Sequence, residues 1–276
     1  MEIFIGPAGN VQASKEPGTE GSLKWIKENG LNAQEIEFVR NVYLTQQRAE
    51  AIGKLAKELG IRLSIHAPYF INLASESKQV LAISKRLILD SADRGERCCA
   101  DTIAIHAAYY YHKDPKKTFD IVKKNFEEIL EEMKARGIKN IKLGVETMAR
   151  ETQFGTLDEV IKLCKEINHK QLVPYIDFAH IFCKNNGKID YAEIFDRLED
   201  LKLKHINSHF EGVKYNVSSK KFVDVHTQMN SHPPFEPLAK EILKRKLNIT
   251  IIAESKPSPE KDALKIKSIF DKLRKQ

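Results

Sequence analysis

The sequence predicts an α/β protein folded as a closed (β/α)8 TIM barrel, with residues 1–276 forming a single domain. Short apolar runs alternate strictly with longer amphipathic segments, a pattern typical of a parallel sheet with right-handed helical crossovers. The chain contains eight such pairs, and its 276 residues suit the roughly 250 residues of an eight-unit barrel. No linker or low-complexity stretch in the sequence suggests a second domain.

The apolar runs are the predicted barrel strands. They are short, and most are rich in isoleucine, valine or leucine, as buried parallel strands are. The runs cover residues 2–6, 33–39, 62–67, 102–107, 141–146, 172–177, 203–210 and 249–254.

The segments between these runs carry helix start and stop signals. One begins with Asp114 as an N-cap residue and Pro115 in its first turn, and it ends at Gly137. Two earlier segments likewise stop at glycines, Gly30 and Gly60. We expect helices within the segments 19–30, 44–60, 77–95, 114–137, 156–167, 190–198, 234–246 and 258–275.

Composition limits the class of protein and its partners. The chain is 42% hydrophobic and 30% charged, which is ordinary for a globular protein. Its formal charge of +7 is compatible with anionic partners such as nucleic acid. A lysine-rich solvated surface would give the same charge, and it is the simpler interpretation when charge is the only observation. The four cysteines form no CxxC pair, and no signal peptide or membrane-spanning run is present, so we expect a cytoplasmic protein without membrane contact.

Potential metal ligands end six consecutive predicted strands. In a (β/α)8 barrel the C-terminal strand ends meet at one rim, where the active site lies. A single histidine there would suit a structural hydrogen bond, but six imidazole or carboxylate endings in register do not. Three carboxylates close together would also repel one another without cations between them. We therefore predict a metal centre at the barrel mouth, with ligands His66, His106, Glu146, Asp177, His209 and Glu254.

Three more ligands are expected in the loops that follow the strands. His180 lies three residues past Asp177, and Asp224 and His226 share one side of an extended segment. Mixed imidazole and carboxylate ligation is typical of zinc, with manganese or iron possible. Nine ligands exceed the needs of one ion, and with a bridging carboxylate they could hold three.

Two nearby residues allow alternative interpretations. His205 shares a strand face with His209 and could compete with it, but His209 lies nearer the strand end and is favoured. Glu211 could contact substrate, although a solvated loop carboxylate is the simpler interpretation.

The motifs in their order resemble a known family. HAPYFINLAS, IAIHAAYY, GVET, IDFAH, SHFEG, DVH and AES follow one another along the chain. Together they resemble the endonuclease IV family of apurinic/apyrimidinic endonucleases, especially its compact archaeal-type members among the xylose isomerase-like barrels. The resemblance covers essentially the whole chain, and HAPYFINLAS is its most specific part.

The resemblance implies a zinc-dependent, monomeric DNA-repair hydrolase that cleaves the phosphodiester 5′ to abasic sites. His66 and His106 would bind a first zinc, and Glu146 would bridge it to a second. Tyr69 matches an aromatic position that faces DNA in the family. We assign catalytic roles to Glu146 and Glu254 as well as metal binding. The remaining implied ligands are Asp177, His209 and Glu254 for the second zinc, and His180, Asp224 and His226 for the third.

The sequence departs from the bacterial members in two loops. The connection FVRNVYLTQQ after the second strand is shorter than their DNA-entering loop, and Arg40 is the candidate substitute as a substrate-binding residue. The Gly-Glu-Gly that follows the last histidine ligand in bacterial members is replaced here by HTQMNSHPPF. Both departures affect expected DNA contacts and leave the predicted ligands unchanged.

A sugar isomerase or epimerase is the rival interpretation, because a related branch of barrels shares this rim. Glu146, Asp177, His209 and Glu254 alone would make a single-metal site, and His180 could then contact substrate. The other predicted ligands have no obvious task in such an enzyme. A non-catalytic member that only binds metal or nucleic acid is a third interpretation, which retention of the complete ligand set disfavours.

Overall fold

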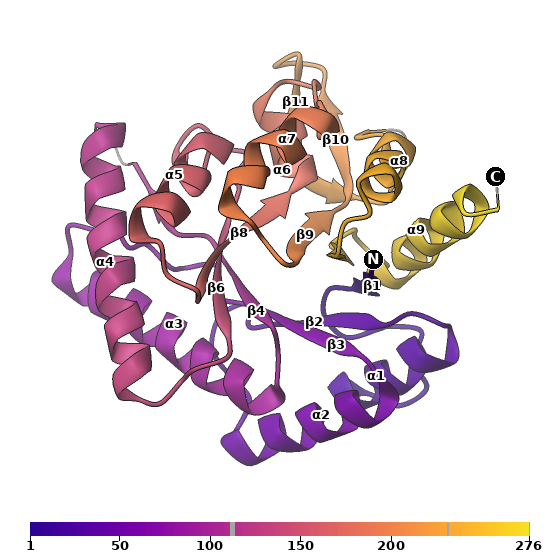
Figure 1. Ribbon diagram of the computed structural model, residues 1–276, viewed down its shortest axis with the longest axis horizontal. Coiled ribbons are helices and arrows are strands. Elements are labelled where there is room, and N and C mark those ends of the chain that lie inside the picture. The colour runs from indigo at the N-terminus through magenta and orange to yellow at the C-terminus, as the bar shows by residue number, and fades with distance from the viewer. Residues whose placement is uncertain (111–113, 231, 276) are drawn as a thin grey trace.

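Eight parallel strands form the barrel in the described part of the chain, residues 1–110, 114–230 and 232–275 of a computed structural model. Figure 1 shows the helices lying around the outside of these strands. The strand order is β1-β12-β9-β8-β6-β4-β3-β2, and each strand overlaps one predicted run. The predicted (β/α)8 barrel is therefore confirmed. The strands are β1 (Ile3–Pro7), β2 (Ala33–Glu37), β3 (Arg62–His66), β4 (Thr102–Ile105), β6 (Lys142–Glu146), β8 (Leu172–Asp177), β9 (Ile206–Phe210) and β12 (Ile249–Ala253).

The barrel closes between β1 and β2 with little regular pairing. An isolated parallel bridge joins Ala8 to Glu35. The side chain of Asn32 accepts a hydrogen bond from the Ile5 N–H at 2.7 Å and donates one to the Ile3 carbonyl at 3.1 Å. A Cβ atom at Gly6 would lie 1.7 Å from the carbonyl oxygen of Ala33, so only glycine permits this close approach.

Each predicted helix is present. Thr45, Ser77, Asp114 and Asp190 cap their helices with side-chain oxygens, and Thr156 forms a capping box with Glu159. The helices are α1 (Gly18–Glu28), α2 (Gln46–Leu59), α3 (Lys78–Cys98), α4 (Pro115–Ala135), α5 (Leu157–Ile167), α7 (Tyr191–Leu198), α8 (Phe235–Arg245) and α9 (Pro259–Leu273).

The expected end of α3 at Gly95 was wrong. The helix continues to Cys98, and Cys99 then takes the left-handed conformation that ends it. A Cβ at Gly95 would lie 2.9 Å from Ile141 Cδ1, so this glycine serves helix–strand packing and does not terminate the helix.

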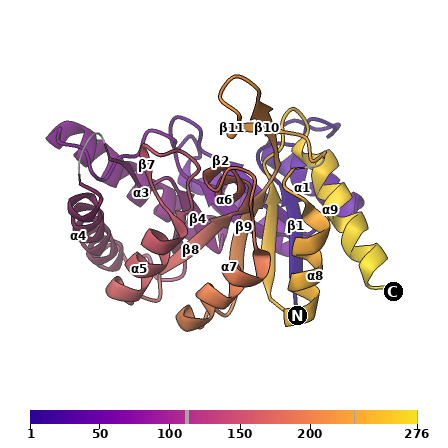
Figure 2. The same ribbon diagram turned by 90° about the horizontal axis from the view of Figure 1, so that it is seen from above.

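Several shorter elements lie at the C-terminal strand ends. The segment after Asp177 was expected to be a loop, but it forms helix α6 (Phe178–Lys184). The extended segment that carries Asp224 is strand β11 (Lys221–Thr227), which pairs antiparallel with β10 (Gly212–Asn216). In Figure 2 this hairpin rises at the end of the barrel opposite the N-terminus. The remaining short elements are β5 (Ala108–Tyr109) paired with β7 (Gln153–Phe154), and the 3-10 helix η1 (Glu199–Leu201).

None of the described helices could span a membrane, because none combines sufficient length with a sufficiently apolar composition.

Candidate metal centre

The predicted ligands at the strand ends converge in the barrel mouth. Each is the last residue of its strand, the next one, or, for His209, the last but one. All are buried except His106, whose side chain is 15% exposed. The six are His66, His106, Glu146, Asp177, His209 and Glu254.

Two histidines face one carboxylate oxygen on one side of the centre. The Nε2 atoms of His66 and His106 lie 3.4 Å and 3.1 Å from Glu146 Oε2. Their ring centroids are 4.9 Å apart and the rings are nearly perpendicular. This arrangement leaves room for an ion between the two imidazoles and Glu146.

The other oxygen of Glu146 belongs to an adjoining group of four residues. His209 Nδ1 lies 3.1 Å from Glu146 Oε1, 3.6 Å from Glu254 Oε2 and 3.9 Å from Asp177 Oδ2. One donor atom from each of the four residues lies within 4.8 Å of the others. Asp177 is positioned by helix α6, because its Oδ1 accepts a hydrogen bond from the His180 N–H at 2.7 Å. Its Oδ2 is left to face the centre.

The third group combines α6 and the β10–β11 hairpin. Asp224 Oδ1 lies 3.4 Å from His180 Nε2 and 3.2 Å from His226 Nε2. Glu211 Oε1 lies 3.8 Å from the same His226 atom. The expectation that Glu211 is solvated was wrong, since it is 0% exposed. Its spacing from His209 was the available signal, because residues two apart on an extended segment face the same side.

The side chains fit divalent cations because several of their donor atoms are buried without a hydrogen-bond partner. A buried charged group that has no partner is strongly destabilising, and a bound cation removes that cost. Among the described residues, the buried atoms at the centre without a hydrogen-bond partner are His66 Nε2, Glu146 Oε2, Asp177 Oδ2, both Glu211 carboxylate oxygens and Glu254 Oε1.

Residues 23–275 match the model of the xylose isomerase-like TIM barrel family. The chain belongs to this family. An uncharacterized protein of Methanocaldococcus jannaschii is 29% identical over 98% of both chains. A probable endonuclease 4 of Sulfurihydrogenibium sp. is 30% identical, but the alignment spans 52% of this chain and 55% of that protein.

Solved structures of two kinds have the same fold. A D-tagatose 3-epimerase-like protein superposes with a TM-score of 0.76 and 20% identity, over 100% of this chain and 97% of the other. Endonuclease IV from Thermus thermophilus gives a TM-score of 0.71 and 18% identity over 100% of both chains. At these identities the likeness concerns the fold, and it does not choose between the two activities.

Contacts behind the metal centre orient the histidines of this xylose isomerase-like barrel. His66 Nδ1 lies 2.7 Å from the Ala67 carbonyl, and His180 Nδ1 lies 2.9 Å from the Thr147 carbonyl. Each contact engages Nδ1 as a donor and directs Nε2 toward the centre.

The most buried of these contacts involves Glu35, which the sequence analysis missed. Its Oε1 lies 2.9 Å from His209 Nε2, and its Oε2 accepts hydrogen bonds from Ser64 and Tyr175. With Nε2 engaged, His209 presents Nδ1 to the centre.

His205 lies outside the centre, with Nε2 2.8 Å from Thr250 Oγ1. Burial and then Arg62 lower the pKa of His205 to about 3.

The electrostatics of the centre show how its charges balance without a cation. Burial raises the pKa of Glu254 to about 7 and raises that of Glu211 well above its usual range. Burial opposes protonation of His66, but the adjacent Glu146 outweighs it and raises the His66 pKa to about 9. Protons therefore offset part of the negative charge in the absence of metal, and cation binding would release them.

A cavity of about 430 Å³ opens over the candidate metal centre. Tyr69 lines it, and its hydroxyl donates a hydrogen bond to Glu37 at 3.2 Å. Arg150 and Lys256 bring positive charge to the wall, and Arg150 Nε lies 3.4 Å from Asp224 Oδ2. Arg40 is exposed in the β2–α2 connection and is absent from the described residues that line this cavity.

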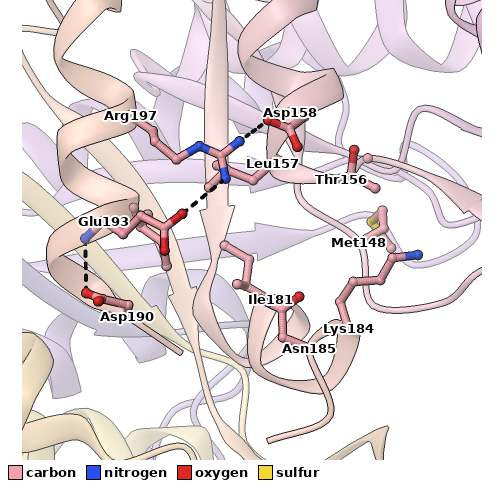
Figure 3. A pocket seen from close by; sticks show the side chains of 12 residues that line it. Met148, Thr156, Leu157, Asp158, Ile181, Lys184, Asn185, Asp190, Glu193 and Arg197 are labelled. Atoms are coloured by element: carbon pink, nitrogen blue, oxygen red, sulfur yellow. Dashed lines mark hydrogen bonds and ion pairs between the residues drawn. The ribbon is translucent and has the colours of Figure 1, made fainter. Parts of the chain in front are cut away.

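A second cavity, of about 250 Å³, lies among α5, α6 and α7 (Figure 3). Its charged side chains are already paired. Arg197 contacts Asp158 and Glu193, and Lys184 pairs with Glu151 at 2.9 Å. None of its described lining side chains has a buried polar atom lacking a partner, so this cavity does not resemble an ion site.

Proposed function

We propose that the chain is a metal-dependent phosphodiesterase of the endonuclease IV type, which hydrolyses DNA 5′ to abasic sites. One observation carries the proposal. Donor atoms gather in three adjoining groups, and two of these groups share Glu146. A one-metal enzyme of this fold would use only the four-residue group. The additional histidines His66, His106 and His180 then need a second and a third ion to explain them.

The ions we propose are zinc, up to three, with manganese or iron as substitutes. The donor set of imidazole nitrogens and carboxylate oxygens supports this choice. Such ions, when bound, supply Lewis acidity to a phosphodiester and lower the pKa of water. The remaining ligand and catalytic roles are proposed as the resemblance implies them, including those of Glu146 and Glu254.

The cavity walls suit an anionic, extruded nucleotide. Arg150 and Lys256 place positive charge where a phosphodiester would approach the centre. Tyr69 offers an aromatic surface beside His66, with ring centroids 4.8 Å apart. A formal charge of +7 favours binding to a polyanion. An abasic nucleotide lacks base stacking, so moving it into the cavity costs less than moving a paired base.

A sugar isomerase or epimerase remains the second candidate. The observation that favours it is that Glu146, Asp177, His209 and Glu254 form a complete ion site by themselves. In such an enzyme one ion would bind the substrate's oxygens, and the other histidines would be incidental.

The test compares the wild-type protein with His106→Ala. We expect the zinc-loaded wild type to cleave an abasic-site duplex 5′ to the lesion, to lose activity with chelator, and to regain it with zinc. His106→Ala should lose cleavage by at least about a hundredfold, because the first group loses one of its two imidazoles while the four-residue group stays intact. Circular dichroism should show an unchanged fold.

The rival candidate predicts a different pattern from the same proteins. A single bound ion per chain, with ketose epimerisation that persists in His106→Ala, would refute the phosphodiesterase proposal. A matched control is His205→Ala, which removes a histidine that lies outside the centre and should leave cleavage unchanged.

A further inference from the structure

We infer that Glu211 is a fourth protein ligand of the third ion, alongside His180, Asp224 and His226. This inference rests on the proposed function, since it concerns one of the three ions proposed there. The family resemblance gave the third ion three protein ligands. The structure adds a carboxylate that approaches the same His226 nitrogen as Asp224 does.

The four donor atoms converge from three parts of the barrel mouth. His226 Nε2 lies 3.2 Å from Asp224 Oδ1 and 3.8 Å from Glu211 Oε1. His180 Nε2 lies 3.4 Å from the same Asp224 oxygen. One donor atom each from His180, Glu211 and His226 lies within 4.8 Å of the others. An ion bound among these atoms would have two imidazole and two carboxylate ligands.

Other roles for Glu211 do not fit its surroundings. A structural carboxylate would accept hydrogen bonds, yet neither oxygen has a hydrogen-bond partner among the described residues. A substrate contact would face the mouth cavity, but Glu211 is fully buried and is missing from the described residues that line it. His180, Asp224 and His226 do line that cavity. The Glu211 carboxylate therefore approaches the proposed ion position from the side away from the cavity.

The backbone beside Glu211 brings this residue close to His226. Gly212 pairs with Thr227 at the start of the β10–β11 hairpin. A Cβ atom at Gly212 would lie 2.2 Å from the Gln228 carbonyl oxygen, so glycine is required for the two strands to meet. Glu211 and His226 each directly precede one member of this pair, and the close approach brings their side chains together.

A fourth protein ligand changes what the third ion does. Four protein donors satisfy a tetrahedral zinc ion, as in structural sites, whereas catalytic zinc keeps an open position. The two carboxylates also match the charge of a divalent cation. We therefore expect the third ion to stay bound without substrate and to join β11, α6 and the end of β9. The His66–His106–Glu146 group has only three protein donors and should lose its ion first on chelation.

The test is a crystal structure of the zinc-loaded wild type, together with zinc-competition titrations of Glu211→Gln. Anomalous scattering should place a Glu211 oxygen about 2.0–2.2 Å from the third ion. In Glu211→Gln, one of the three zinc affinities should fall at least about tenfold. Glu151→Gln, an exposed carboxylate change near the same helix, should leave all three unchanged.

The stability of the metal-free variant separates the loss of a ligand from misfolding. The metal-free Glu211→Gln protein should unfold at or above the wild-type temperature, because an amide removes the cost of burying the Glu211 carboxylate without a hydrogen-bond partner. A third ion whose Glu211 oxygens stay beyond about 3 Å, or unchanged affinities in Glu211→Gln, would overturn the inference. Wild type with three ions that does not cleave abasic DNA would refute the proposed function alone. Cleavage by a protein whose third ion lacks Glu211 would refute the inference alone.

Discussion

At the scale of single residues, Glu35 controls which nitrogen of His209 faces the metal centre. An imidazole in its neutral form can donate from one nitrogen and bind metal through the other. The buried Glu35 carboxylate holds His209 Nε2 at 2.9 Å and receives the hydroxyls of Ser64 and Tyr175. His209 is therefore held ready to bind an ion through Nδ1.

We predict that Glu35→Gln weakens zinc binding to the four-residue group about 10- to 100-fold. The amide can donate to His209 Nε2, which would shift the ring proton to Nδ1 and block it as a ligand. Competition with a fluorescent chelator measures the change. Glu37→Gln is the matched control, because Glu37 lies on the same strand but contacts Tyr69. Equal zinc affinities in the wild type and Glu35→Gln would contradict this role.

At the scale of elements, close backbone approach decides where glycine is required. The seam between β1 and β2 has only one bridge among the described residues, so its geometry depends on the small size of Gly6 and the side chain of Asn32. Strand alternation in the same region turns Glu35 toward the interior, where it meets His209. Closing this seam is therefore also what brings β2 into the metal centre.

We predict that Gly6→Ala destabilises the protein by about 1–3 kcal/mol or more, because the methyl group would overlap the Ala33 carbonyl. Denaturant unfolding measures the change in the free energy of unfolding. Gly60→Ala provides a comparison. Gly60 has φ +70 and open space among the described atoms around its Cβ position, so alanine there should cost only about 1–2 kcal/mol of backbone strain. A Gly6→Ala protein as stable as wild type would show that the seam can widen freely.

At the scale of the whole molecule, the proposed metal centre joins parts of the chain that are far apart in sequence. Its donors come from the ends of β3, β4, β6, β8, β9 and β12, from α6, and from the hairpin. Their unpartnered buried oxygens repel one another in the metal-free protein. Ion binding should therefore stabilise the barrel as a unit.

We predict that zinc raises the unfolding temperature of chelator-treated protein. Saturation at 100 times the dissociation constant adds about 2.7 kcal/mol for each site, provided the unfolded chain does not bind. Calorimetry of metal-free and zinc-loaded samples measures the shift. Magnesium should have a much smaller effect, because it prefers oxygen ligands and retains its water. An unchanged unfolding temperature with zinc would argue against buried ion sites.

Much of the fold was predictable because its signals are local. The positions of the apolar runs and the capping by residues such as Asp114 depend on neighbours in sequence. Each run overlaps one strand of the structure, and Asp114 caps α4. Barrel topology then places the last strand residues at one rim, which explains why His66 and Glu254 were expected together. Helix α6 was missed because its seven residues follow Asp177 directly, with no separate start signal.

The sequence by itself determined the eight-unit barrel and the side chains available at its mouth, since periodicity and strand order require no distant contact. Tertiary structure alone decided which of these side chains meet. Strand alternation turns Glu35 and Glu211 inward, but it does not say which side chains they meet there. Contacts between separate parts of the chain decide this, with His209 for Glu35 and His226 for Glu211. Those contacts depend on closure of the barrel seam and on the fold of the hairpin, and both arise from packing between distant parts of the chain.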